Sequence, residues 1–214
     1  MPQPAPDVKL PPDVKLPKVA ICYPSGDMVH ADFTLALAGL CLVTHPLEVT
    51  VVNAKSSIVA EARNNGVEEA RNAKADFLLF LDSDMVFPIT LVHRLLLHQK
   101  EIVGAVYTKR KPPFSLLGTR LGDSPTAGGL VEMSRLPTGC LMIAMPVFEA
   151  LSKPYFRFGI DSETGDLIGE DYCFCDAARA AGFQLWADLE LSRQIGHIGE
   201  QVYRVPPELG GLSG

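Results

Sequence analysis

Positive charge is scarce in this sequence. Its 19 Lys and Arg residues are outnumbered by 25 Asp and Glu residues, which gives a formal net charge of −6. Binding nucleic acid or an acidic membrane over a broad area requires a basic face, so the composition argues against both functions. The local exception is one basic stretch, Lys109-Arg110-Lys111.

Long apolar runs are also missing. The longest one, Phe33–Val43, is interrupted by Thr34 and Gly39, and it is shorter than the roughly 20 residues that a membrane-spanning helix needs. We therefore expect no membrane span. The chain opens with a polar, proline-rich segment, which is unlike a signal peptide.

Cysteines are few and odd in number. They are scattered, mostly inside apolar runs, at Cys22, Cys41, Cys140, Cys173 and Cys175. Such a distribution does not indicate a disulfide framework. Cys173 and Cys175 are two positions apart in a predicted helix and point to different sides, which argues against a metal clip. We expect a reducing, cytoplasmic environment.

The composition changes twice along the 214 residues, which predicts one domain between two tails. Residues 1–17 contain a tandem duplication of PDVKLP, at 6–11 and 12–17, whose prolines favour an extended tether. Residues 18–199 form the predicted domain, which is long enough to bury a substantial core. Residues 200–214 form a loose tail.

Strand patterns alternate with helix patterns inside the predicted domain. The predicted strands are 18–23, 47–53, 77–81, 101–107, 139–145 and 184–188. The predicted helices are 29–44, 56–75, 88–97, 146–153 and 170–181. This alternation predicts an α/β fold with a mostly parallel, Rossmann-like sheet flanked by helices. Residues 108–128 show no period and predict a long loop of the kind that is usually functional.

Three of the predicted strands have candidate binding residues at their carboxyl ends. These residues are Tyr23-Pro24, Asn53 and Asp82-Ser83-Asp84. Ligands of parallel sheets bind beyond the carboxyl ends of the strands. We therefore expect these residues to share one rim of the sheet.

Asp82 and Asp84 come directly after the buried strand FLLFL. In an extended segment, residues i and i+2 point to the same side, so both carboxylates could approach one centre. Like charges this close need a cation or a proton between them, and Mg²⁺ or Mn²⁺ suits carboxylate oxygens. The alternative is that the two acids bind backbone N–H groups of a turn.

A second acid pair, Glu170-Asp171, opens a predicted helix after Gly169. The helix dipole alone favours acids there, but a carboxylate at that position could also serve as a general base toward a hydroxyl. Further along, His197 is flanked by glycines. An imidazole that joined the first acid pair would shift the metal preference from Mg²⁺ toward Mn²⁺.

Three enzyme classes use motifs of this kind. In a haloacid-dehalogenase-type phosphatase, Asp82 would be the nucleophile and Lys109 or Lys111 the required lysine, but that fold carries its motif on the first strand. In a second class, the acids hold a metal that carries a nucleotide diphosphate, and the two preceding strands build the nucleotide pocket. The order of elements favours the second class. A nucleotidyltransferase would need a longer, glycine-rich loop than Pro24-Ser25-Gly26-Asp27.

Taken in order, the motifs resemble those of GT-A fold glycosyltransferases, specifically the compact bacterial and phage-type members with a DxD motif. The resemblance covers roughly residues 18–199. Its motifs are Tyr23-Pro24, the stretch from Ser57 to Ala62-Arg63-Asn64, FLLFLDSDMVFP, VGAVYTKR, PTGCLMI with VFEAL, GEDYCFC and IGHIG.

The resemblance implies a nucleotide-sugar donor site. Tyr23, Pro24, Ser57 and Arg63 would line the nucleoside pocket. Lys109 and Arg110, on the same loop, would steady the diphosphate.

The resemblance also implies a metal and a base. Asp82, with Ser83 beside it, would lie near the ribose and the metal, while Asp84 and His197 would ligate Mn²⁺ or Mg²⁺ directly. Asp171, or failing it Glu170, would be the base that activates the acceptor.

The sequence therefore leads to one main hypothesis and two alternatives. The main hypothesis is a metal-dependent transferase that moves a hexose from a nucleotide diphosphate sugar, such as UDP-glucose, to a hydroxyl acceptor. The alternatives are the phosphatase described above and a nucleotide-sugar binding module without turnover.

Overall fold

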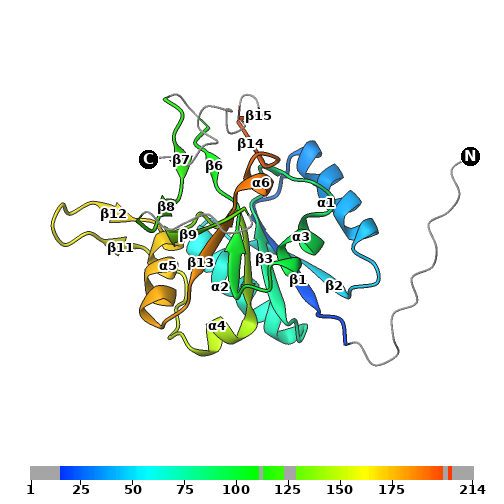
Figure 1. Cartoon of the computed structure of the whole chain (residues 1–214), viewed down its shortest axis with the longest axis horizontal. Coiled ribbons are helices and arrows are strands. Elements are labelled where there is room, and N and C mark those ends of the chain that lie inside the picture. The colour runs from blue at the N-terminus through cyan, green and yellow to red at the C-terminus, as the bar shows by residue number, and fades with distance from the viewer. Residues whose placement is uncertain (1–14, 111–112, 123–128, 200–201, 204–214) are drawn as a thin grey trace, which may run out of the picture.

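An eight-stranded sheet forms the centre of the computed structural model, which describes residues 15–110, 113–122, 129–199 and 202–203 (Figure 1). Its strands lie in the order β2-β1-β3-β10-β5-β13-β9-β8. Their bounds are β1 (Val19–Ser25), β2 (Val49–Lys55), β3 (Phe77–Leu81), β5 (Ile102–Gly104), β8 (Thr119–Arg120), β9 (Leu130–Arg135), β10 (Cys140–Ala144) and β13 (Leu185–Asp188). Only β10 and β9 run against the common direction. The sheet is therefore mostly parallel, as predicted.

Helices cover both faces of this sheet. They are α1 (Ala31–Val43), α2 (Val59–Asn72), α3 (Leu91–Leu97), α4 (Met145–Glu149), α5 (Glu170–Ala180) and α6 (Leu189–Ser192). Along β3, Leu78 and Phe80 pack in a core with α2, α4 and α5, whereas Leu79 and Leu81 pack in a core with α1, α3 and α6. This division follows from the strand geometry, because successive side chains point to opposite faces. The predicted α/β fold is confirmed.

The region after β5 differs from the prediction. The predicted strand 101–107 is divided between β5 and β6 (Tyr107–Thr108), and β6 pairs with β7 (Leu116–Leu117) outside the central sheet. The predicted loop 108–128 thus contains β7 and β8 within its described part. Strands of two residues are too short to show a hydrophobic period, so they could not be predicted from the sequence.

Two further small sheets lie beside the central one. In one of them, β14 (Gly196–Ile198) pairs with both β4 (Met85–Val86) and β15 (Val202–Tyr203). The other is a hairpin of β11 (Gly159–Ile160) and β12 (Leu167–Ile168). Because β15 falls inside the predicted tail 200–214, part of that tail belongs to the folded unit.

Most of the PDVKLP duplication lies outside the described residues, and at its end Lys15 Nζ is 3.9 Å from a carboxylate oxygen of Asp76. All five cysteines are free thiols. Across the described ranges, no helix combines the length and the apolar character that crossing a bilayer requires.

Candidate functional site

Asp82 and Asp84 lie at the carboxyl end of β3, but they do not point toward a common centre. The backbone N–H of Met85 donates to the carbonyl of Asp82 at 3.0 Å, which makes residues 82–84 a turn rather than an extended segment. The side chain of Asp82 then turns to Arg63, and the side chain of Asp84 turns to Arg110 and His197. The rim position was predicted correctly, whereas the shared orientation of the two carboxylates was wrong.

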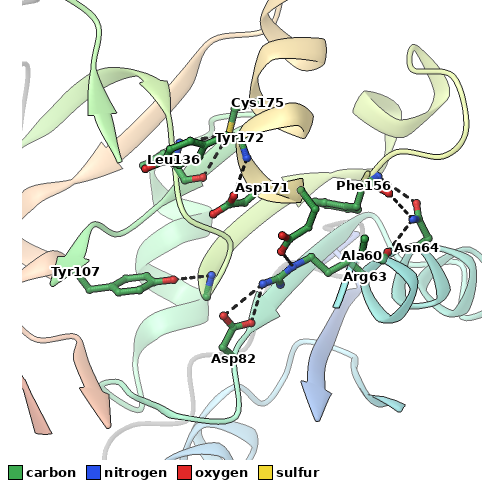
Figure 2. Close-up of polar contacts among 12 residues, drawn as sticks. Ala60, Arg63, Asn64, Asp82, Tyr107, Leu136, Phe156, Asp171, Tyr172 and Cys175 are labelled. Carbon is green, nitrogen blue, oxygen red and sulfur yellow. Dashed lines mark hydrogen bonds and ion pairs between the residues drawn. The ribbon is translucent and has the colours of Figure 1, made fainter. Parts of the chain in front are cut away.

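Arg63 is a buried cation between two acids (Figure 2). From α2, its Nη2 lies 3.0 and 3.3 Å from the two carboxylate oxygens of Asp82, and its Nε donates to Glu170 at 3.0 Å. Burial alone would lower the pKa of Arg63, but the charges of Asp82 and Glu170 outweigh it and raise that pKa above its ordinary value. Nη1 is also buried and has no hydrogen-bond partner among the residues that the structure describes.

The acid pair at the start of α5 is divided between two roles. The Glu170 carboxylate is buried and held by Arg63. Asp171 is only partly buried and lines an open cavity of about 540 Å³ together with Lys109, Arg135 and other residues. Burial, followed by the negative charge of Glu170, raises the pKa of Asp171 to about 6. A carboxylate of this kind, beside open space and with a pKa near neutrality, suits a general base.

Asp84 and His197 form the second half of the site. The backbone N–H of Ile198 donates to the carbonyl of Asp84 at 2.7 Å, which fixes β14 against the turn. His197 Nδ1 lies 2.9 Å from the carbonyl of Thr108. A carbonyl only accepts hydrogen bonds, so Nδ1 donates to it, and Nε2 is the nitrogen that lies 3.5 Å from Asp84 Oδ2.

Charges around Asp84 keep it ionised. Burial alone would raise the pKa of this carboxyl, but the hydrogen bond and charge of His197, together with the charge of Arg110, outweigh burial and lower it. Arg110 Nη1 is 2.7 Å from the same oxygen, Oδ2.

The predicted metal ligands fit only in part. Within the described part of the chain, no group of three or more His, Cys, Asp or Glu side chains is arranged to hold a metal ion. Asp82 does not join Asp84 and His197, because both of its oxygens are bound by Arg63. The remaining pair does fit a divalent ion: it combines a carboxylate with an imidazole whose other nitrogen is fixed by a carbonyl, an arrangement typical of metal-binding histidines.

The predicted nucleoside side of the rim lies on β1 and β2. In the register of the sheet, Cys22 pairs with Phe80, so Pro24 reaches the level of Asp82 on the neighbouring strand. Tyr23 packs on Phe33 with their ring centroids 5.4 Å apart. Beyond β2, Ser57 is exposed at the approach to α2, and Ser83 is half-buried in the turn after β3.

Lys109 and Arg110 are adjacent but serve different parts of the site. The Lys109 side chain lines the cavity beside Asp171, whereas Arg110 reaches Asp84. The predicted basic loop is therefore split between the two halves of the site. Adjacent residues in an extended segment point to opposite sides, and Lys109 directly follows β6.

Two residues of the site were not predicted. Tyr107 is buried, and its hydroxyl accepts a hydrogen bond from the Gly139 N–H at 2.9 Å. Arg135 lies on β9 with its guanidinium 5.3 Å from the ring centroid of Tyr172, beside the cavity that holds Asp171. The only sequence signal for Tyr107 was its place in VGAVYTKR, and Arg135 lies in a strand that was not predicted.

Comparison with known proteins identifies the fold but not a family. No family model matches the sequence, and no curated protein matches it. Solved structures do match, among them the crystal structure of A197 from STIV, with a TM-score of 0.60 and 19% sequence identity. The match covers 89% of this chain and 91% of that one. At this identity, the similarity supports the α/β fold alone.

Proposed function

We propose that this protein is a metal-dependent glycosyltransferase that takes a hexose from a nucleotide diphosphate sugar, with a UDP-sugar such as UDP-glucose as the first candidate. The donor would lie along the rim formed by the ends of β1 and β3. The acceptor would lie in the cavity beside Asp171, and its hydroxyl would be the attacking group. Membership of the GT-A type of glycosyltransferase is part of the proposal.

The observation that carries the proposal is that a pair of possible metal ligands and a possible general base lie at separate points along this rim. Asp84 and His197 offer oxygen and nitrogen donors on one side, and Asp171 has a raised pKa of about 6 on the other. Arg63 links the two sides, since it binds Asp82 after β3 and Glu170 beside Asp171. A transferase needs these two functions near each other: charge stabilisation at the leaving group and proton removal at the acceptor.

Each residue then has a definite task. Asp171 accepts the proton of the acceptor hydroxyl, an effect typically of about 10²- to 10⁴-fold on the rate. Glu170 is bound to Arg63 and keeps the negative environment that raises the pKa of Asp171. Asp84 and His197 would hold Mn²⁺ or Mg²⁺, which when bound supplies Lewis-acid stabilisation of the departing diphosphate.

The phosphatase alternative is disfavoured by the surroundings of Asp82. A nucleophilic carboxylate must have an oxygen free to attack phosphorus, but Arg63 engages both oxygens of Asp82. In addition, β3 is the third strand of the chain rather than the first. The later acid pair that such a phosphatase needs would be Glu170 and Asp171, but these residues open α5 instead of ending a strand.

A donor screen tests the proposal. Thermal-shift titrations with UDP and GDP, with and without Mn²⁺, should show nucleotide stabilisation that depends on the metal. Incubation with UDP-sugars and a panel of hydroxyl acceptors should then release UDP. A shift without any release would indicate a binding module, and hydrolysis of p-nitrophenyl phosphate without a UDP shift would indicate a phosphatase.

A further inference from the structure

The cation bound to Asp84 in this structure is the guanidinium of Arg110. Arg110 Nη1 lies 2.7 Å from Asp84 Oδ2, and His197 Nε2 lies 3.5 Å from the same oxygen. The Asp84 side chain is only 19% exposed. The charged end of Arg110 therefore lies at the mouth of the pair that would hold a metal.

We infer that Arg110 is a built-in competitor of the divalent ion: it neutralises Asp84 when no metal is bound and has to leave Asp84 when a metal binds. This inference rests on the proposed function, because it concerns the same metal site. A guanidinium that stays hydrogen-bonded to Oδ2 uses the lone pairs that a metal needs. It would also place two positive charges within a few ångströms of each other, which is unfavourable.

The local structure allows Arg110 to leave without disturbing the ligands. Arg110 is carried by the chain just after β6, and its side chain is 53% exposed, so it can change rotamer into solvent. His197 is held differently, because its Nδ1 binds the backbone carbonyl of Thr108 within β6. β6 thus fixes the metal ligand His197 through the backbone carbonyl of Thr108. The competing cation, Arg110, lies two positions after Thr108 in the chain.

The released guanidinium has an obvious new partner. A diphosphate bound to the metal brings negative oxygens to the same place, and Arg binds phosphate through paired hydrogen bonds. Arg110 would then exchange a carboxylate for a phosphate. Metal and nucleotide should consequently bind cooperatively, and each should raise the affinity for the other by the same factor.

Direct measurement of Mn²⁺ binding tests this mechanism without any turnover. Titration calorimetry, or the electron paramagnetic resonance signal of free Mn²⁺, is applied to the wild type, to Arg110→Gln and to Lys109→Gln. The last variant is a matched control: it removes the same charge one position away, from a side chain that lines the other cavity. Thermal denaturation without metal verifies that all three proteins are folded.

In the absence of nucleotide, Arg110→Gln should bind Mn²⁺ about two- to fivefold more tightly than the wild type, which is the upper part of the range expected for removing a partly exposed competing ion pair. Lys109→Gln should change the affinity less than twofold. Addition of UDP should strengthen Mn²⁺ binding more in the wild type than in Arg110→Gln.

The outcomes separate the inference from the function on which it rests. If the wild type binds Mn²⁺ and Arg110→Gln binds it no more tightly, the competitor role is wrong while the metal site stands. An equal gain in both variants would show only a general charge effect and would also overturn it. If none of the three proteins binds Mn²⁺, the metal-dependent function and the inference both fail.

Discussion

Arg63 and Glu170, 107 positions apart in the sequence, form an ion pair in the interior of the protein, with Arg63 Nε 3.0 Å from Glu170 Oε1. The same guanidinium also binds Asp82, so one side chain of α2 joins the end of β3 to the start of α5 (Figure 2). Arg63 therefore ties the residue that ends β3 to the acid pair at the start of α5.

Replacing Arg63 should destabilise the protein severely. Arg63→Met leaves the carboxylates of Asp82 and Glu170 without their cation, and removing one partner of a buried pair typically costs about 3 to 5 kcal/mol. Urea denaturation at neutral pH measures the loss. Arg63→Met combined with Glu170→Gln should recover part of it, because one unpaired charge is then absent. A loss below about 1 kcal/mol in the single variant would mean that Arg63 does not hold these elements together.

The activity should depend on pH through Asp171. Its carboxyl group has a pKa of about 6 and acts as a base only when it is unprotonated, so kcat/KM should rise with pH and level off above about 7. Glu170→Gln removes the negative charge that contributes to the raised pKa, and its midpoint should move to lower pH. The rate of UDP release between about pH 5 and 8 measures both profiles. Identical pH midpoints for the wild type and Glu170→Gln would show that Glu170 does not contribute to the raised pKa of Asp171.

Asp171 should also make the free energy of unfolding depend on pH. Its pKa in the folded state is raised above the ordinary value of 3.8, so the folded protein holds this proton more tightly than the unfolded chain does. The resulting stabilisation is present below about pH 4 and is lost as the pH rises through about 6. Asp171→Asn should lose transfer, keep UDP binding and lack this pH-dependent loss of stability. Denaturation of both proteins at pH 4.5 and 7 checks the sign, and a parallel decline in the variant would contradict it.

The sequence predicted those parts of the fold that have a strong hydrophobic period. β3 was placed at its observed residues, and α2 lies within the helix predicted over 56–75 from apolar residues at helical spacing. The sequence also placed Tyr23-Pro24, Asn53 and Asp82-Ser83-Asp84 on one rim, because parallel strands end at the same edge. The elements that could not be predicted depend on which strands pair with each other: β6 pairs with β7, and β9 pairs with β13. The ion-pair partners of a buried arginine likewise depend on the tertiary structure. From the sequence alone, Arg63 could equally have been a solvent-exposed residue on a helix.

Asp84 should be essential for metal-linked nucleotide binding. Asp84→Ala removes the carboxylate and leaves His197 as the only remaining side chain of the pair, so Mn²⁺ should no longer increase the affinity for UDP. A fluorescence or calorimetric titration of UDP with and without Mn²⁺ measures the difference. Lys153→Gln, which removes a partner of Glu68 on the surface, serves as the control and should retain the full Mn²⁺ effect. Undiminished Mn²⁺-linked affinity in Asp84→Ala would place the metal elsewhere.

Gly139 should tolerate no side chain, because its Cα faces the hydroxyl of Tyr107 and the carboxylate of Asp82. A Cβ there would collide with the Tyr107 hydroxyl and lie 2.9 Å from Asp82 Oδ2. The same residue donates its N–H to Tyr107 and accepts a hydrogen bond from the Asp82 N–H at 3.1 Å.

Neither neighbour of Gly139 can move freely, since Tyr107 is buried and Asp82 is held by Arg63. Gly139→Ala should therefore lower the free energy of unfolding by about 1 to 3 kcal/mol, as overpacking of a tight site does. It should also weaken UDP binding, because the carboxylate of Asp82 has to shift. Gly26→Ala is the matched control for stability: apart from the chain neighbours, no atom of the described residues lies within 4 Å of a Cβ at that position. Its unfolding midpoint in urea should stay close to that of the wild type. Equal midpoints for the two variants would show that the end of β3 can rearrange around an added methyl group, and the donor site would then be less rigid than these contacts require.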